Sequence, residues 1–120
     1  LIAIEQGHNA PFEIKRVYYI FDTKDGVERG FHAHINLKQI CIAVKGSCTF
    51  VLDDGKKREE IKLTNPNQGL FIEGLIWREM KNFSPDCVLL VIASEHYDES
   101  DYIRDYDKFL KESNKEIYCL

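Results

Sequence analysis

The sequence predicts an all-β domain, an antiparallel sandwich or barrel, with a short helix near its C-terminus. Short runs rich in β-branched and aromatic residues recur along most of the chain, as they do in strands. Turn signals such as Asp25-Gly26 and Asp53-Asp54-Gly55 separate these runs. Because no helical periodicity lies between them, a parallel sheet with crossover helices is not expected.

The expected strands, in chain order, occupy residues 15–21, 31–35, 39–44, 47–52, 59–63, 70–73, 76–81 and 87–93. The dense apolar run 39–44 ends at Lys45-Gly46, and the loop 65–69 reads Asn-Pro-Asn-Gln-Gly. The apolar stretch 1–4 also resembles the middle of a strand. Since the chain begins there without methionine, we expect a single domain over residues 1–120 that lacks its native N-terminal strand segment.

The last part of the chain changes character. Ser100 is a suitable N-cap for a helix that begins near Asp101. Aromatic and apolar residues then recur at roughly helical spacing, namely Tyr102, Tyr106, Phe109 and Leu110. The acidic residues of this stretch are expected on the solvated surface of that helix, namely Asp98, Glu99, Asp101, Asp105 and Asp107.

Composition and charge argue against several classes of protein. The 120 residues are 44% hydrophobic and 30% charged, which suits one globular domain. The net charge of −4 argues against nucleic acid as a partner, because binding a phosphate backbone needs a basic face. No apolar run is long enough to cross a membrane, and no signal peptide is visible. The four cysteines, Cys41, Cys48, Cys87 and Cys119, form no C-x-x-C pair, so we expect reduced thiols in a cytoplasmic protein.

The most specific feature is the series Gly26, His32-Ala33-His34, Gln39 and Gly46. Alternate residues of a strand point to the same face, so His32 and His34 are expected to face one cavity. This spacing resembles the first motif of the cupin superfamily, in which a glutamate stands at the position of Gln39. The resemblance implies a cupin jelly roll, an antiparallel β-sandwich or barrel.

A metal site is not expected. In metal cupins two histidines, the glutamate and a later histidine bind a divalent cation. The second cupin motif resembles residues 69–77 here, with Trp77 where the later histidine would stand and Arg78 beside it. Gln39 is neutral and a guanidinium repels a cation, so we expect no metal and no other cofactor.

Longer motifs cover nearly the whole chain, at residues 12–20, 29–34, 45–48, 52–55, 76–80, 84–91 and 97–106. Together they resemble the dTDP-sugar 3,4-ketoisomerase family of WxcM-like cupins. The resemblance implies a metal-free homodimer that converts dTDP-4-keto-6-deoxy-D-glucose to a dTDP-3-keto-6-deoxyhexose through an enediol. It places that reaction in deoxyamino-sugar synthesis for surface glycans such as lipopolysaccharide or S-layer glycan.

The resemblance also implies roles for individual residues. His32 is the base that removes the C3 proton, and an imidazole with a pKa of about 6.5 suits that task at neutral pH. His34 orients the sugar or shares the proton relay. Tyr18 either donates to the developing oxyanion or packs against a neighbouring strand. Tyr19 points the other way in a regular strand and is expected to pack.

Substrate contacts are expected from charged and aromatic side chains. Arg29 and Arg78 each offer a fork of donors for the diphosphate or the keto oxygens, although Arg29 could equally be a solvated turn residue. Because arginine is a poor proton donor, Arg78 is expected to influence the face on which C4 is reprotonated. Trp77 either walls the cavity or belongs to the core. Lys81 and Arg104 are phosphate contacts or, as is more usual, solvated surface residues.

Three other functions are compatible with these residues. A dTDP-keto-sugar 3,5-epimerase would use the same histidine base and return the proton elsewhere. A metal-dependent cupin, such as a dioxygenase, would contain stoichiometric iron or manganese. A non-catalytic nucleotide-sugar-binding module would bind the same ligand without turnover.

Overall fold

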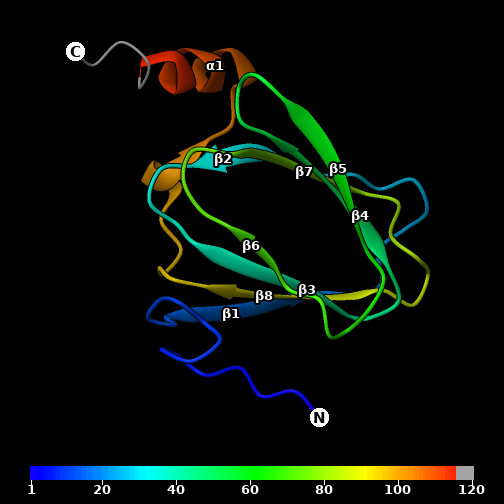
Figure 1. Cartoon of the computed structure of the whole chain (residues 1–120). Coiled ribbons are helices and arrows are strands. Elements are labelled where there is room, and N and C mark those ends of the chain that lie inside the picture. Colours follow the sequence, from blue (N-terminus) through cyan, green and yellow to red (C-terminus); the bar gives the residue numbers. More distant parts are fainter. Residues whose placement is uncertain (116–120) are drawn as a thin grey trace.

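The structure is a computed structural model and describes residues 1–115. Its elements are β1 (Arg16–Ile20), β2 (Arg29–His34), β3 (Gln39–Lys45), β4 (Cys48–Asp53), β5 (Arg58–Leu63), β6 (Leu70–Ile72), β7 (Trp77–Lys81), β8 (Val88–Ala93), the 3₁₀ turn η1 (Glu99–Asp101), β9 (Tyr102–Ile103) and α1 (Tyr106–Lys115). Two antiparallel sheets face each other, with strand orders β1-β8-β3-β6 and β5-β4-β7-β2-β9 (Figure 1). Most neighbouring strands are distant in sequence, as in a jelly roll.

The predicted fold class is confirmed. Each expected strand is present, with both ends within two residues of those expected. The core fills the space between the sheets, where Phe50 and Met80 from one sheet meet Cys41, Leu89 and Val91 from the other. Full burial of such side chains contributes about 1.5–3 kcal/mol each, which makes this layer the main source of stability.

The N-terminal segment covers part of the outer face of the β1-β8-β3-β6 sheet, and it is drawn in dark blue in Figure 1. Ala10 is fully buried there beside Ile40, Ile42 and Ile92, and Ile4 packs against this group. Residues 1–4 form no strand, so that prediction was wrong. Packing of Ile4 on the sheet, rather than pairing with it, accounts for part of their apolar character.

Helix α1 lies against the outer face of the other sheet, at the top of Figure 1. Trp77 is buried beneath it with Ala33, Ile103 and Phe109, and the Trp77 ring meets the ring of Tyr106 edge to face at 5.2 Å. The indole of Trp77 therefore belongs to a small core on the outer face. The expectation that it could wall the cavity is corrected, because alternate residues of β7 point to opposite faces.

The helix begins at Tyr106 and not near Asp101, which corrects the predicted start. Asp105 precedes it, and its carboxylate accepts hydrogen bonds from the backbone nitrogens of Asp107 (2.9 Å) and Lys108 (3.2 Å). These contacts satisfy amides that a helix start leaves unpaired. Asp105 therefore has the N-cap role that was predicted for Ser100.

Residues 101–103 are not α-helical, also contrary to prediction. Ser100 lies inside the short turn η1, and Tyr102 begins β9. In β9, Tyr102 pairs with His34 and Ile103 with Ala33. This pairing brings η1 and its acidic residues beside the H-x-H motif.

The described cysteines match their prediction. Cys41, Cys48 and Cys87 are buried free thiols, and Cys119 lies outside the described residues. Burial raises the pKa of Cys41 to about 12, so its thiol is not a nucleophile near neutral pH.

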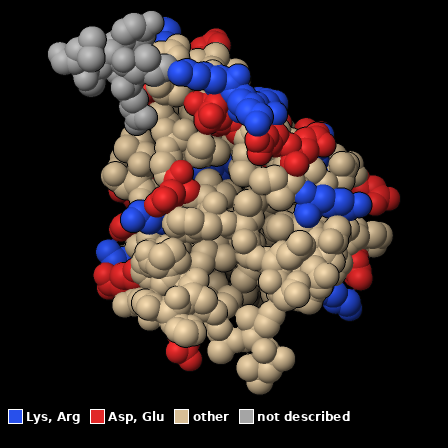
Figure 2. All heavy atoms as spheres, in the orientation of Figure 1, with Lys and Arg blue, Asp and Glu red and all other residues tan. Residues whose placement is uncertain are grey.

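None of the described helices has the length and apolar character needed to cross a membrane. On the face shown in Figure 2, charged side chains lie mainly around the margin, with no continuous basic patch.

Candidate active site

The site is organised by an irregularity in β2. In the pairing of β2 with β7, Gly30 lies opposite Glu79 and His32 lies opposite Arg78. Phe31 is therefore an extra residue, a β-bulge of the kind often found next to active sites. Gly30 and Phe31 both have positive φ angles, 90° and 57°. A positive φ is uncommon for a residue as bulky as Phe31, which marks the bulge as a strained point.

This bulge changes which side chains share a face. In a regular strand, Arg29 would point away from His32 and His34. With one extra residue between them, Arg29 and both histidines lie on the inner face, while Ala33 packs under α1. The rings of His32 and His34 are 4.8 Å apart, which confirms that the two histidines face the same space.

The hydrogen bonding of His32 defines its tautomer. Its Nδ1 lies 3.0 Å from the carbonyl oxygen of Gly30. A carbonyl can only accept, so Nδ1 carries the hydrogen and Nε2 keeps its lone pair. The pKa of His32 is lowered from 6.5 to about 4, chiefly by burial and also by the nearby charges of Arg78 and Arg104. The ring is therefore neutral at physiological pH, with Nε2 able to accept a proton.

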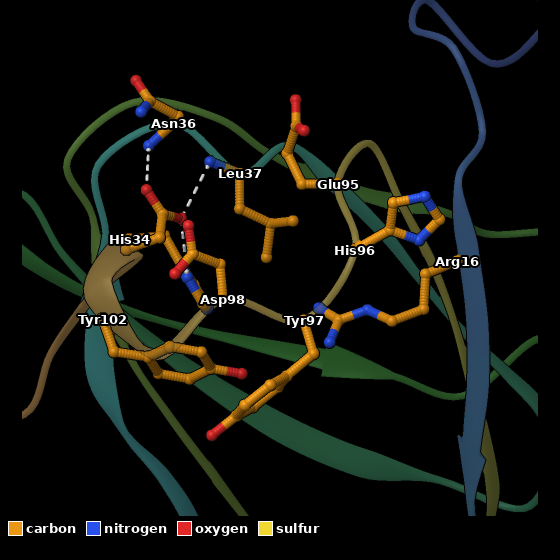
Figure 3. Close-up of a pocket in the computed structure, with 10 residues that line it drawn as sticks. Arg16, His34, Asn36, Leu37, Glu95, His96, Tyr97, Asp98 and Tyr102 are labelled. Atoms are coloured by element: carbon orange, nitrogen blue, oxygen red, sulfur yellow. Dashed lines mark hydrogen bonds and ion pairs between the residues drawn. The ribbon is translucent and has the colours of Figure 1, made fainter.

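His34 is held by a carboxylate that was expected on the solvated surface of a helix. Its Nδ1 lies 3.1 Å from Oδ2 of Asp101, and His34 itself is 1% exposed. The same carboxylate accepts from the backbone nitrogens of Asn36 (2.8 Å) and Leu37 (3.2 Å), and Figure 3 marks these contacts with dashed lines. Burial, and then the charge of Arg78, keep the pKa of His34 far below its ordinary value. Within the described residues Nε2 of His34 has no partner.

Two adjacent cavities open at this site. One, of about 520 Å³, is lined by Tyr18, Arg29, His32 and Arg104 among others. The other, of about 470 Å³, is lined by His34 and by the loop that follows β8. Arg16 and Tyr102 line both, and Figure 3 shows them with Tyr97 at the second cavity. Adjacent cavities of this size suit a ligand of two parts.

A buried polar chain lies beneath the first cavity. Arg78 is 2% exposed, and its Nη1 donates to Oε1 of Gln39 at 2.6 Å. Nε2 of Gln39 donates in turn to the Tyr18 hydroxyl at 3.2 Å. Burial raises the pKa of Tyr18 to about 12, so the phenol stays protonated. The chain joins a buried cation to a phenol that lines the cavity.

These side chains do not suit a divalent cation. Arg78 lies opposite His32 and binds Gln39, so its guanidinium stands among the groups that resemble cupin metal ligands. In residues 1–115, no cluster of three or more His, Cys, Asp and Glu side chains is placed to hold a metal ion. A fixed positive charge beside the histidines opposes cation binding.

The predicted charged substrate contacts occupy three kinds of position. Arg29 and Arg104 line the first cavity, and Arg104 lies over the Tyr102 ring at 4.2 Å. Arg104 comes from the segment between β9 and α1, not from the helix. Lys81 lies on the outer face of β7, where Nζ pairs with Glu60 at 2.6 Å; this is the surface position that was expected as the more usual of its two alternatives. Arg78 lies under the cavity surface rather than in it.

Some residues of the site were not anticipated. Arg16 lines both cavities, and its charge lies near the rings of Tyr18 and Tyr97. Tyr102 packs on both histidines, with ring centroids 4.9 and 4.3 Å away. Asp101 was hidden in an acidic run whose other members are solvated, and no local pattern distinguishes it.

Comparison with known proteins identifies the family. Residues 1–114 match the family described as FdtA, or WxcM-like, C-terminal, and the chain belongs to that family of cupin-type proteins. It is 55% identical, over 92% of its length and 80% of the relative's, to TDP-4-oxo-6-deoxy-α-D-glucose-3,4-oxoisomerase of Aneurinibacillus thermoaerophilus.

Solved structures of ketoisomerases have the same fold. A 3,4-ketoisomerase from Helicobacter canadensis superposes with a TM-score of 0.92 at 54% identity, over 95% of this chain and 86% of that one. QdtA from Thermoanaerobacterium thermosaccharolyticum, in a histidine-to-asparagine variant bound to TDP-4-keto-6-deoxyglucose, gives a TM-score of 0.95 at 44% identity, over 98% and 86% of the two chains. A 3′-monoepimerase from Streptomyces bikiniensis, at 16% identity and a TM-score of 0.67, shares the fold alone.

Proposed function

We propose that this protein is a 3,4-ketoisomerase that acts on TDP-4-keto-6-deoxyglucose and moves the ketone from C4 to C3. The observation that carries the proposal is the state of His32, which is neutral, has its Nδ1 held by the Gly30 carbonyl and its Nε2 free, and lines the first cavity. The chain that contains it is 55% identical to an oxoisomerase of this specificity. The reaction needs a base beside C3 and a donor for the enolate oxygen. His32 and Tyr18 are placed to supply them.

The chemistry is an internal oxidation and reduction that needs no external electron acceptor. Nε2 of His32 takes the proton from C3, and the electron pair of that bond forms the enediolate. Tyr18 donates a hydrogen bond to the developing oxyanion. The proton of the C3 hydroxyl moves to the C4 oxygen, and return of a proton to C4 then completes the ketone at C3, so the hydrogen count of the sugar is unchanged. His34 is neutral and held by Asp101, which suits it to orient the sugar or relay the proton.

The diphosphate needs positive charge close to the sugar. Arg16, Arg29 and Arg104 line the cavities and supply it. Arg104 is already paired with Glu99, with Nε 2.7 Å from Oε1. No carboxylate pairs with Arg16 or Arg29 within residues 1–115, so their guanidinium groups are available to phosphate oxygens.

The 3,5-epimerase alternative uses the same base and differs in the fate of the proton. Substrate labelled with ¹³C at C3 and C4 separates the two, because only an isomerase moves the carbonyl signal from one label to the other. We expect the carbonyl resonance of C4 to decay while that of C3 grows. Tight binding of the sugar nucleotide with no change in either signal would indicate a binding module.

A homodimer is also proposed. β1 is an edge strand whose outward side chains Val17 and Tyr19 are 56% and 62% exposed, and Phe21 beyond it is 57% exposed. Tyr19, which was expected to pack, contacts Phe21 at 5.9 Å between ring centroids and is otherwise open. An exposed apolar edge of this kind favours a partner surface. Sedimentation of a monomer at micromolar concentration would refute the dimer.

The free, buried thiols support a cytoplasmic location, where cysteines remain reduced. Detection of the full-length protein in a secreted fraction would contradict that location.

A further inference from the structure

We infer that Gln39 is a positioning residue whose amide, locked by Arg78, turns the hydroxyl hydrogen of Tyr18 into the active-site cavity. The inference rests on the proposed function for its catalytic consequence. Its structural content, the direction of one hydrogen bond, is testable without turnover.

The first step is the orientation of the Gln39 amide. Oxygen and nitrogen of a glutamine amide differ in what they can do, because the oxygen only accepts and the nitrogen only donates. Arg78 has donors and no acceptor, and its Nη1 lies 2.6 Å from one end of the amide. That end must therefore be the oxygen. Gln39 is 3% exposed, so solvent offers no competing arrangement.

The second step follows for Tyr18. With its oxygen bound to Arg78, Gln39 presents its NH₂ group to the Tyr18 hydroxyl at 3.2 Å. The phenol oxygen is then the acceptor in that contact, and its own hydrogen must point elsewhere. No other hydrogen-bond partner for this hydroxyl lies within residues 1–115. Tyr18 lines the same cavity as His32, so its hydrogen is free for a ligand oxygen.

The third step concerns charge. The guanidinium polarises the Gln39 amide, and the amide polarises the phenol, because hydrogen bonds in a chain strengthen one another in a low dielectric. Arg78, a buried cation that does not touch the sugar, thus strengthens Tyr18 as the hydrogen-bond donor that does. The chain works in this direction only with a neutral amide in the middle. A carboxylate at position 39 could accept from Arg78 and from Tyr18, and would turn the phenol hydrogen away from the cavity.

Two substitutions separate this positioning role from simple packing. Gln39→Glu keeps shape and the contact with Arg78 but reverses the Tyr18 hydrogen bond. Gln39→Met removes both contacts and leaves the Tyr18 hydrogen free to enter the cavity. We expect Gln39→Glu to lower kcat about 100-fold with KM within threefold, as for loss of one oxyanion donor. We expect Gln39→Met to be at least tenfold more active than Gln39→Glu but to have the lower melting temperature.

Packing alone would not make Gln39→Met more active than Gln39→Glu while making it less stable. A packing role predicts that the less stable Gln39→Met is also the less active, and that order would overturn the inference. Adding Tyr18→Phe to Gln39→Glu should cost no more than Tyr18→Phe alone, within threefold, because both remove the same donor. A double variant whose loss of activity equals the product of the two single losses would also overturn the inference. Assays contain EDTA, and Gln68→Glu, in an exposed loop, is the charge-matched control.

An infrared measurement tests the hydrogen-bond direction without substrate. The C–O stretch of ring-labelled tyrosine differs between a phenol that accepts and one that donates, and the spectrum of Tyr18→Phe identifies the Tyr18 band by subtraction. We expect an accepting phenol in the wild type and a donating one in Gln39→Glu. An identical band in both would refute the inference even if the isomerase assay succeeds. An inactive wild type with the expected band shift would instead refute the proposed function.

Discussion

The carbonyl oxygen of Gly30 lies 3.0 Å from Nδ1 of His32, and this contact decides which ring nitrogen can act as a base. It holds the hydrogen on Nδ1 and leaves Nε2 unprotonated at the cavity. Because the acceptor is main chain, the strand that carries the histidine also sets its tautomer. The bulge at Phe31 places both groups, so the chemistry of His32 depends on the backbone path of β2.

The pH dependence of the reaction should reflect a depressed histidine pKa. The pKa of His32 lies near 4 rather than 6.5, chiefly because of burial, and the active form is the neutral one. kcat/KM should therefore stay level from pH 8 to about 5 and fall below about pH 4. Initial rates across this range test it, with circular dichroism to show that the protein remains folded. An acidic limb near pH 6.5 would mean that the ring is solvated or that another group is the base.

Gly30→Ala should damage the site more than another glycine substitution with the same backbone conformation. Both Gly30 and Gly26 have positive φ angles, 90° and 74°, but only at Gly30 would a Cβ approach the backbone, 2.9 Å from the Arg78 oxygen. We expect Gly26→Ala to lower the free energy of unfolding by about 1 kcal/mol and Gly30→Ala by about 2–4 kcal/mol. Urea unfolding of the two variants measures the difference. Equal losses would show that the bulge relaxes without strain.

Asp101→Asn should weaken the support of His34. The carboxylate accepts from the His34 ring and from two backbone amides, and an amide has only one accepting atom. We expect a loss of about 1–3 kcal/mol in the free energy of unfolding and about a tenfold drop in kcat/KM. Asp25→Asn, in an exposed turn, is the matched control and should change neither. Wild-type kinetics in Asp101→Asn would show that the reaction does not depend on the support of His34 by Asp101.

Lys81 and Arg104 should respond differently to truncation. Lys81 faces Glu60 on the outer surface of β7, whereas Arg104 lines the first cavity. Arg104→Ala should raise KM about tenfold, since it removes a positive charge from the wall of the cavity that is proposed to take the diphosphate. Lys81→Ala should leave KM within twofold. Steady-state kinetics at fixed ionic strength give the KM of each variant. A raised KM in Lys81→Ala would show that Lys81 takes part in substrate binding.

Local sequence patterns predicted most of the fold. The apolar and β-branched runs gave strands within two residues of their ends, because each run packs one face on the core. The pairing of His32 and His34 on one face followed from the period of a strand alone. The alternatives for Trp77 and Lys81 stayed open in the sequence because adjacent residues of β7 face opposite ways. Only one of Trp77 and Arg78 could face inward, and the sequence does not say which.

The rest of the site depends on register and on long-range pairing. Arg29 shares a face with the histidines only because Phe31 is an extra residue, and no composition rule marks that position. Asp101 reaches His34 because β9 pairs with β2, which joins segments 67 residues apart. The helical spacing of Tyr102 and Tyr106 concealed that short strand. Such contacts are set by tertiary packing and not by local propensity.

The most direct test of the central claim is the fate of the C3 proton. The protein and its His32→Asn variant are incubated with TDP-4-keto-6-deoxyglucose in heavy water, and the sugar protons are followed by NMR. The wild type should form a 3-keto sugar that carries deuterium at C4, and the variant should form none. Deuterium at C3 and C5 with the ketone still at C4, or an undiminished rate in His32→Asn, would contradict the assignment of an isomerase with His32 as its base.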